Sequence, residues 1–281
     1  MLKTIIFDSA FFNATDTLDC GQVFRYFKED NGYIVISKDK ICYLETINNK
    51  TLLICESEDE EYFYNYFDLV TDYNQIFQRA QASKYGILKK ASELGKGVRI
   101  LRQNNEEMMF SFLISQNNNI PRIKKALNLI CEKLGEKIEF RGNTYFAFPS
   151  LETLSAQSIE FYRDCGLGYR AEYIKILAEE LNSGLISKIK NLDVVSMKKE
   201  LISIKGIGEK VADCITLFGF YKTQSFPVDV WIERIYREDF SGTLTNRNKI
   251  TAYFIDEFGE DAGYFQQYLF YYKRTLEKTI K

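Results

Sequence analysis

Two residues near the carboxyl end of the sequence have the types and the spacing needed for covalent chemistry. Lys210 follows Gly206 and Gly208 in the run Gly-Ile-Gly-Glu-Lys, and Asp229 lies in the later run Phe-Pro-Val-Asp-Val-Trp. A neutral lysine amine is a nucleophile, and a fixed carboxylate stabilises a neighbouring positive charge. We expect the positive end of a helix to favour the neutral amine of Lys210, and a helix N-cap position to favour ionised Asp229. The pair therefore predicts an amine nucleophile with an anionic partner.

The glycines before Lys210 indicate a second property, the binding of an anion. Two glycines separated by one apolar residue join two amphipathic stretches within residues 195–222 and let the backbone turn tightly. The second stretch, if helical, offers its first N–H groups to a phosphate. Such turns also join helices that bind nothing, and Asp229 has the position of an ordinary N-cap. Taken singly, each pattern leaves the structural and the functional interpretation open.

The residue types that are missing narrow the possible chemistry. The 281-residue chain contains no histidine, which excludes Ser-His-Asp and Cys-His nucleophiles and histidine-ligated zinc. The six cysteines form no Cys-x-x-Cys pair, so neither a zinc site nor an iron–sulfur cluster is predicted. Isolated cysteines in apolar segments are typical of buried thiols in a reducing compartment. Because no signal peptide or long apolar run is present, we expect a cytoplasmic protein.

The charge of the chain is distributed unevenly. The formal net charge is −2, which by itself argues against a nucleic-acid partner. However, residues 1–84 hold 8 Lys and Arg against 14 Asp and Glu, whereas the rest holds 29 against 25. The acidic surplus therefore belongs to the first third, and the remainder is compatible with an anionic partner.

The first third of the sequence has the pattern of an antiparallel sheet. Short aromatic and β-branched runs, separated by turn signals, predict strands at 2–7, 22–27, 33–37, 41–45 and 51–55. A helical period begins near residue 59. The fold class expected is therefore α+β, with an N-terminal antiparallel sheet domain and a closing helix at 1–85, followed by a mostly α-helical domain at 86–281.

Helices are expected to carry the remaining motifs. Apolar residues at 120, 123, 127, 130 and 134 predict one helix that begins after an asparagine cap and stops at Gly135. The run Cys-Gly-Leu-Gly-Tyr-Arg at 165–170 predicts a glycine-broken turn between helices. The last helix is expected at 261–279.

Several motifs in the same order and spacing resemble one enzyme family. They lie at 20–25, 98–103, 110–123, 166–171, 206–214 and 227–229. Together they resemble the 8-oxoguanine DNA glycosylases, a bifunctional glycosylase and AP lyase branch of the helix-hairpin-helix DNA glycosylase superfamily. The resemblance extends from about residue 15 to about residue 275, and the chain is similar to a compact bacterial-type member.

The resemblance implies a base-excision mechanism and a partner. The implied partner is double-stranded DNA with 8-oxoguanine opposite cytosine. The protein is expected to act as a monomer in the cytoplasm, at the nucleoid, without membrane association. Lys210 attacks C1′ of the deoxyribose and forms a Schiff base, which permits β-elimination, and Asp229 stabilises the developing sugar cation. Base recognition is implied for the carbonyl of Gly21, for the sandwiching pair Cys214 and Phe270, and for Gln266 at the Watson–Crick edge.

The resemblance also implies roles in holding the duplex. Asn117 fills the space left by the extruded nucleotide, Tyr169 wedges the opposite strand, and Arg122 and Arg170 read the estranged cytosine. Backbone N–H groups of Gly206, Gly208 and Lys210 hold a phosphate. No cofactor is required and no iron–sulfur cluster is implied, but carbonyls of Ile202, Ile204 and Ile207 are implied to coordinate a structural monovalent or calcium ion.

Two positions depart from the family pattern, and other functions stay open. Trp231 stands where eukaryotic members have a phosphate-contacting histidine, and Lys205 replaces the usual proline of the hairpin.

One alternative is a helix-hairpin-helix glycosylase for another lesion, such as an alkylated base or thymine glycol. Another is a non-catalytic module that binds DNA through the hairpin. The structural alternatives are that Cys214 and Phe270 only pack in the core and that Gln266 and Tyr169 only lie on the surface.

Overall fold

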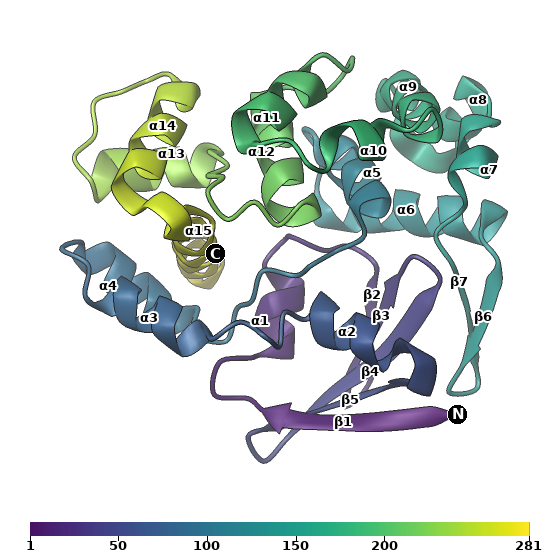
Figure 1. Cartoon of the computed structure of the whole chain (residues 1–281), viewed down its shortest axis with the longest axis horizontal. Helices are drawn as coiled ribbons and strands as arrows, with labels where there is room; N and C mark the ends of the chain where they lie inside the picture. The colour runs from purple at the N-terminus through teal and green to yellow at the C-terminus, as the bar shows by residue number, and fades with distance from the viewer. Residues whose placement is uncertain (281) are drawn as a thin grey trace.

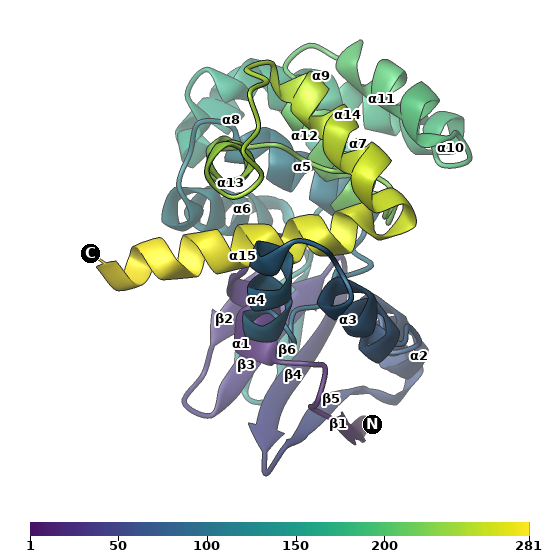
Figure 2. The same cartoon turned by 90° about the vertical axis from the view of Figure 1, so that its left-hand side faces the viewer.

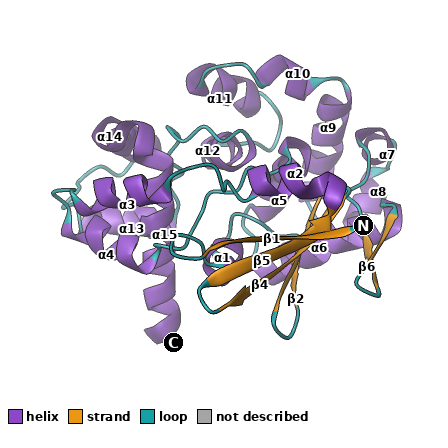
Figure 3. Cartoon of the chain, turned by 60° about the horizontal axis from the view of Figure 1, so that its bottom comes forward, coloured by secondary structure: helices purple, strands orange, loops and turns teal. Residues whose placement is uncertain are grey.

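The chain folds into an antiparallel sheet with a larger body of helices above it, as the computed structural model shows (Figures 1 and 2). The structure describes residues 1–280, so Lys281, the last residue of the expected second domain, lies outside it. Figure 3 shows the larger sheet gathered on one side of the molecule and most helices on the other. The expected α+β class is confirmed.

The main sheet has five strands in the order β1-β5-β4-β3-β2, and every neighbouring pair is antiparallel. The strands are β1 (Leu2–Asp8), β2 (Tyr26–Lys28), β3 (Gly32–Ser37), β4 (Lys40–Ile47) and β5 (Lys50–Glu56). Four of them match the predicted segments closely. The predicted strand at 22–27 is shorter and later, because the buried Gln22 side chain bonds to other backbone groups. It donates to the Arg99 carbonyl at 2.6 Å and accepts from Leu101 N–H at 2.9 Å.

Fifteen α-helices occur in the described part of the chain, together with two short 3₁₀ and two short π segments. In chain order they are α1 (Ala14–Asp19), α2 (Glu60–Tyr66), α3 (Tyr73–Gln81), α4 (Gly86–Leu94), α5 (Asn105–Ser115), α6 (Ile120–Leu134), α7 (Leu151–Ser155), α8 (Ile159–Tyr162), α9 (Arg170–Asn182), α10 (Leu185–Ile189), α11 (Val194–Ile202), α12 (Glu209–Cys214), α13 (Val230–Glu238), α14 (Arg247–Phe258) and α15 (Ala262–Ile280).

Helix α6 illustrates why local signals were sufficient for many of these elements. Asn119 caps it by accepting the Arg122 N–H at 3.0 Å, Pro121 lies in the first turn, and the helix ends before Gly135. Its buried stripe contains Ile123, Leu127 and Ile130 at the helical period, as predicted.

A β-hairpin inside the helical half was not predicted. Strands β6 (Lys137–Phe140) and β7 (Asn143–Phe146) pair with each other, and Phe140 and Tyr145 join a small apolar cluster with Ile34 and Tyr43 of the main sheet. The hairpin therefore covers part of the outer face of the sheet with residues from the second half of the chain.

Two larger cores hold the molecule together, one under the sheet and one among the helices. The predicted boundary at residue 85 falls between α3 and α4, and it stays a prediction. Helix α4 packs against α15, which Figure 2 shows running across the base of the helical body. Helix α15 also contacts α1 of the first half, because the Tyr271 hydroxyl donates to Asp16 at 2.5 Å and Arg274 donates to the Asp19 carbonyl at 2.9 Å.

Candidate active site

The predicted hairpin is present and consists of α11, a glycine turn and α12. Gly206 has φ +96°, and a Cβ there would lie 2.5 Å from the Tyr173 ring, so both conformation and space require glycine. Gly208 has an extended backbone, and nothing lies within 4 Å of the position of a Cβ. Since no side chain caps α12, the N–H groups at its start are open to an anion.

Lys210 lies in the first turn of α12 and is only partly exposed. Its Nζ is 5.6 Å from the centre of the Phe112 ring. Burial opposes the charge of Lys210, but the neighbouring Cys214 and Asp229 outweigh burial, and the pKa is raised above its ordinary value. The expectation of a lowered pKa was therefore wrong, because groups from outside the first turn outweigh the helix end.

Asp229 is the N-cap of α13, as its sequence position predicts. One carboxylate oxygen accepts the N–H groups of Trp231 and Ile232, both at 3.0 Å. Burial nevertheless raises the pKa of Asp229, although the Ile232 N–H and the charge of Lys210 act in the opposite direction. The cap favours the ionised form as expected, but desolvation is the larger effect.

A small cavity of about 60 Å³ brings the predicted base-recognition residues together. Gly21, Cys214, Gln266 and Phe270 all line it, although they lie far apart in the sequence. The complete lining consists of Cys20, Gly21, Phe112, Lys210, Cys214, Phe218, Pro227, Asp229, Gln266, Gln267 and Phe270. Burial raises the pKa of the Cys214 thiol to about 11, so this side chain is a neutral wall of the cavity at neutral pH.

Gln266 presents an unused hydrogen-bonding atom in this cavity. Its side chain is 4% exposed, and its Nε2 donates to the Pro227 carbonyl at 3.2 Å. Its Oε1 is buried and has no hydrogen-bond partner. A buried unpaired acceptor destabilises the fold, so this atom is placed to accept a hydrogen bond from a ligand.

A much larger groove of about 950 Å³ adjoins the same two reactive residues. Lys210 and Asp229 line both the cavity and the groove. Other predicted residues that line the groove are Asn117, Arg122, Tyr169 and Gly208. Asn117, which follows α5 with φ +45°, is exposed, and Tyr169 is 56% exposed, so both stand out from the surface.

Arg170 and Gly206 do not line the groove but support its wall. The buried guanidinium of Arg170 donates to the carbonyls of Gln116 and Asn117, the latter at 2.7 Å. Gln116 in turn donates to the Gly206 carbonyl at 2.7 Å. These bonds tie the Asn117 loop to the hairpin, and the role of Arg170 in reading cytosine stays a prediction.

Sequence reasoning missed three polar residues near this groove. Gln116 lies inside a motif that was recognised, but its bridging role depends on the contact with the hairpin. Arg247 and Asn248 line the groove from the start of α14. An asparagine cap at Asn246 marks that helix in the sequence, yet nothing local shows that α14 reaches the reactive residues.

The structure shows the contacts of Trp231 and Lys205, the two residues that depart from the family pattern. Trp231 is not among the described residues that line the groove, and the Arg234 guanidinium lies 5.3 Å from the centre of its ring. Lys205 forms an ion pair with Glu172.

The three carbonyls predicted to hold an ion lie at the end of α11 and in the turn. The Ile204 carbonyl accepts the Ile207 N–H at 3.0 Å, which leaves one lone pair for an ion. Neutral carbonyl oxygens suit a hard cation. Among the described residues, no cluster of three or more His, Cys, Asp or Glu forms an alternative metal site.

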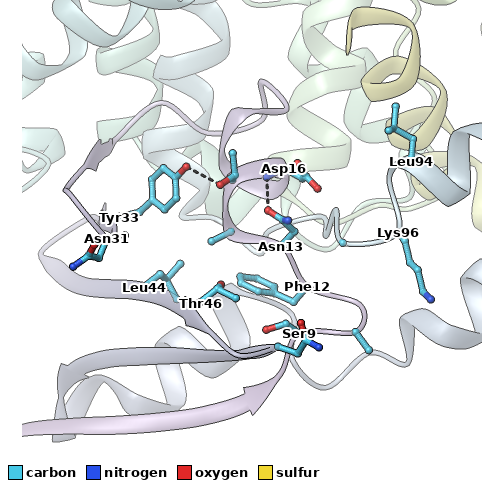
Figure 4. A pocket seen from close by; sticks show the side chains of 16 residues that line it. Ser9, Phe12, Asn13, Asp16, Asn31, Tyr33, Leu44, Thr46, Leu94 and Lys96 are labelled. Carbon is cyan, nitrogen blue, oxygen red and sulfur yellow. Dashed lines mark hydrogen bonds between the residues drawn. The ribbon is translucent and has the colours of Figure 1, made fainter. Parts of the chain in front are cut away.

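A third hollow lies in the sheet half, away from Lys210 (Figure 4). Its polar groups are largely paired with each other. The Tyr33 hydroxyl bonds to Thr15 at 2.8 Å, and Asn13 accepts the Asp16 N–H at 3.0 Å. None of the predicted site residues lies in it.

Comparisons with known proteins agree with both halves of the chain. Residues 4–109 match the family model of the 8-oxoguanine DNA glycosylase N-terminal domain, and residues 110–260 match that of the HhH-GPD superfamily of base excision DNA repair proteins. A probable N-glycosylase/DNA lyase from Methanothermobacter thermautotrophicus is 32% identical, over 74% of this chain and 72% of that protein. An N-glycosylase/DNA lyase from Saccharomyces cerevisiae is 31% identical, over 70% of this chain and 56% of the yeast protein.

A solved structure covers nearly the whole chain. It is the 8-oxoguanine glycosylase/lyase of Clostridium acetobutylicum in complex with double-stranded DNA containing cytosine opposite 8-oxoguanine. The two chains are 35% identical with a TM-score of 0.91, and the match covers 99% of this chain and 98% of the other. No helix in the described residues is long and apolar enough to cross a membrane.

Proposed function

The chain belongs to the 8-oxoguanine DNA glycosylase family of the HhH-GPD superfamily, and on that premise we propose that it excises 8-oxoguanine opposite cytosine and then nicks the DNA strand. One observation carries the assignment of residues. Lys210 and Asp229 lie at the junction between a small cavity and a large groove. A base extruded from a duplex in the groove would enter the cavity with its sugar between these two side chains.

The chemistry proposed for Lys210 is nucleophilic. Because its pKa is raised, the amine must first lose a proton. The amine nitrogen then bonds to C1′ while the C1′–N9 bond breaks. The electrons of the C1′–N9 bond leave with the base, which takes up a proton. Opening of the sugar ring at the C1′–O4′ bond gives the Schiff base. Loss of a C2′ proton then breaks the C3′–O3′ bond, and water releases Lys210.

Asp229 is proposed to act electrostatically, by stabilising positive charge on the sugar. The anchored carboxylate cannot turn away from the sugar, because both Trp231 and Ile232 donate to it. A negative group that is already oriented stabilises the positive charge that develops on the sugar. It also assists proton transfer during the later steps.

The cavity is proposed to recognise the base. The Gly21 carbonyl accepts the N7–H that distinguishes 8-oxoguanine from guanine, whose bare N7 would face it as a second acceptor. The free Oε1 of Gln266 accepts from the Watson–Crick edge. Cys214 and Phe270 cover the two faces of the ring. Because the cavity holds only about 60 Å³, its walls must move apart when a base enters.

The groove is proposed to hold the duplex. Asn117 and Tyr169 project where the helix is opened, and Arg122 and Arg170 read the estranged cytosine. The N–H groups of Gly206, Gly208 and Lys210 bind a phosphate at the start of α12. Carbonyls of Ile202, Ile204 and Ile207 hold a monovalent or calcium ion that stiffens the turn, with no role in the chemistry.

We further propose that the protein acts as a monomer in the cytoplasm, at the nucleoid. All six cysteines are free and buried, which suits a reducing compartment.

Borohydride trapping on a duplex with 8-oxoguanine opposite cytosine tests the proposal. The wild-type protein should form a covalent adduct and release 8-oxoguanine, and Lys210→Gln should do neither. Lys188→Gln, which removes an exposed lysine paired with Glu200, is the matched control and should retain the adduct. Asp229→Asn should slow excision by about 10²-fold.

The same assay separates the remaining alternatives. Release of alkylated bases or thymine glycol in preference to 8-oxoguanine would assign a different lesion. Binding without an adduct or a nick, unaffected by Asp229→Asn, would indicate a non-catalytic module. Repeating the assay with each of the four bases opposite the lesion measures how strictly cytosine is required.

A further inference from the structure

Arg247 contributes a cation to the groove beside the reactive residues. It is the first residue of α14, and Asn246 fixes the start of that helix by accepting the N–H groups of Asn248 at 2.9 Å and Lys249 at 3.2 Å. Its side chain is 47% exposed and lines the groove together with Lys210 and Asp229. The charge of Arg247 also acts to lower the pKa of Asp229, although burial, the larger effect, raises it.

The guanidinium of Arg247 is held in place on one side only. Its Nε and Nη2 both donate to the same oxygen of Glu233, at 3.1 and 3.0 Å. The other oxygen of Glu233 accepts from Arg237. Two guanidinium groups thus share one carboxylate, so the cluster keeps a net positive charge. Among the hydrogen bonds of the described residues, none occupies Nη1 of Arg247.

Two carboxylates near Lys210 on the groove already share a cation from the protein itself. Glu209 and Asp213 line the groove, and both pair with Lys198 of α11, at 3.5 and 2.6 Å. The free donor of Arg247 is therefore oriented by Glu233 yet available to an anion from outside. A guanidinium that is preoriented in this way suits a phosphate.

We propose that Arg247 binds a backbone phosphate of the DNA strand that carries the extruded nucleotide, next to the reacting sugar. The inference rests on the proposed function. Each internal deoxyribose is bonded to two phosphates, so a sugar between Lys210 and Asp229 brings both phosphates to the groove walls. The start of α12 provides for one of them, and Arg247, on a separate element, provides for the other.

The salt dependence of DNA affinity tests this role. Binding is measured with the full-length Lys210→Gln protein, which cannot turn over, on the duplex with 8-oxoguanine opposite cytosine. Adding Arg247→Gln should weaken binding about tenfold and make the slope of log K against log salt shallower by about 0.9. Arg237→Gln is the matched control, because Arg237 shares Glu233 but does not line the groove. Equal slopes for the two arginine variants would overturn the proposal.

Neutral methylphosphonates identify the phosphate. Replacing the phosphates on either side of the 8-oxoguanine nucleotide one at a time should reveal one position at which the parent protein loses affinity and Arg247→Gln loses none. An equal loss in both proteins at both positions would contradict the contact. Failure of the proposed function looks different: the parent protein would show no preference for the damaged duplex, while the two arginine variants would still differ in slope.

Discussion

Lys210, the proposed nucleophile, has surroundings that favour its protonated form. Burial favours the neutral amine, but Cys214 and Asp229 together favour the ammonium and raise its pKa. Asp229 is also shifted, because burial raises the pKa of its carboxyl. In the resting site Asp229 therefore ionises at a higher pH than a free aspartate, and Lys210 keeps its charge to a higher pH than a free lysine.

These shifts predict the pH dependence of excision. The single-turnover rate should rise with pH first as Asp229 ionises and again as Lys210 loses its proton, and both steps should lie above the ordinary pKa values of the side chains. At the ordinary lysine pKa, log k should therefore still rise by about 1 per pH unit. A profile measured in single turnover checks this, and a plateau reached below that pH would contradict the raised pKa of Lys210.

Gln266 offers a test of base recognition that leaves the reactive pair intact. Gln266→Leu removes the Oε1 that we assign to the Watson–Crick edge, so kcat/KM for 8-oxoguanine should fall by about 10-fold to 100-fold. Tm should change little, because loss of the bond to Pro227 is offset by removal of a buried unpaired oxygen. Steady-state kinetics and thermal unfolding measure the two effects. A large fall in Tm with unchanged kcat/KM would make Gln266 a structural residue.

At the scale of the element, the two glycines of the hairpin have different reasons to be glycine. Gly206 needs its conformation and meets the Tyr173 ring, whereas Gly208 meets nothing. Packing explains the first, whereas Gly208 is the N-cap of α12 and has open space beside it. This contrast makes the pair a matched set for separating folding from binding.

Substitution of each glycine by alanine should separate those two effects. Gly206→Ala should destabilise the protein by more than about 1 kcal/mol, because the Cβ meets an aromatic ring at positive φ. Gly208→Ala should cost less than about 1 kcal/mol, yet weaken DNA binding, since its Cβ enters the space proposed for a phosphate. Urea unfolding and DNA titration measure the two quantities. Unchanged affinity of Gly208→Ala would argue against a phosphate at this turn.

At the scale of the whole molecule, a buried network joins the sheet half to the site. Asp68 is fully buried and accepts from Arg102 at 2.7 Å, Tyr73 at 3.0 Å and Tyr221 at 2.5 Å. The Tyr221 hydroxyl also bonds to that of Tyr264, 2.7 Å away and two residues before Gln266 on α15. The network therefore fixes the segment of α15 that is proposed to recognise the base against the rest of the fold.

Asp68→Asn should reveal how much stability this junction provides. Asparagine tolerates the positive φ of +51° at this position, so the change removes the charge while keeping the backbone conformation. Losing the anion leaves Arg102 poorly paired, and the free energy of unfolding should fall by about 3 kcal/mol. Tyr221→Phe, which removes one hydroxyl, should cost about 1 kcal/mol. A loss for Asp68→Asn no larger than that for Tyr221→Phe would show that the charge contributes little.

The sequence by itself determined the elements that local signals specify. The N-cap at Asp229, helix α6 with its asparagine cap, the glycine turn before Lys210 and four of the five sheet strands each depend on residues a few positions apart. Helix capping, the backbone conformation of glycine and the spacing of apolar residues all act over such short distances, so they can be predicted without knowing the fold. The family motifs added, as a set, the residues proposed to react and those proposed to recognise the base.

Only the tertiary structure decided what depends on residues far apart in the chain. It joined Gly21 to Cys214 and Phe270 in one cavity, placed the β6–β7 hairpin on the sheet, and brought Arg247 to the groove. It also reversed the expected pKa shift of Lys210, since desolvation and neighbouring charges come from every element packed around a group. Burial and electrostatic fields are sums over the whole fold, and no local pattern contains them.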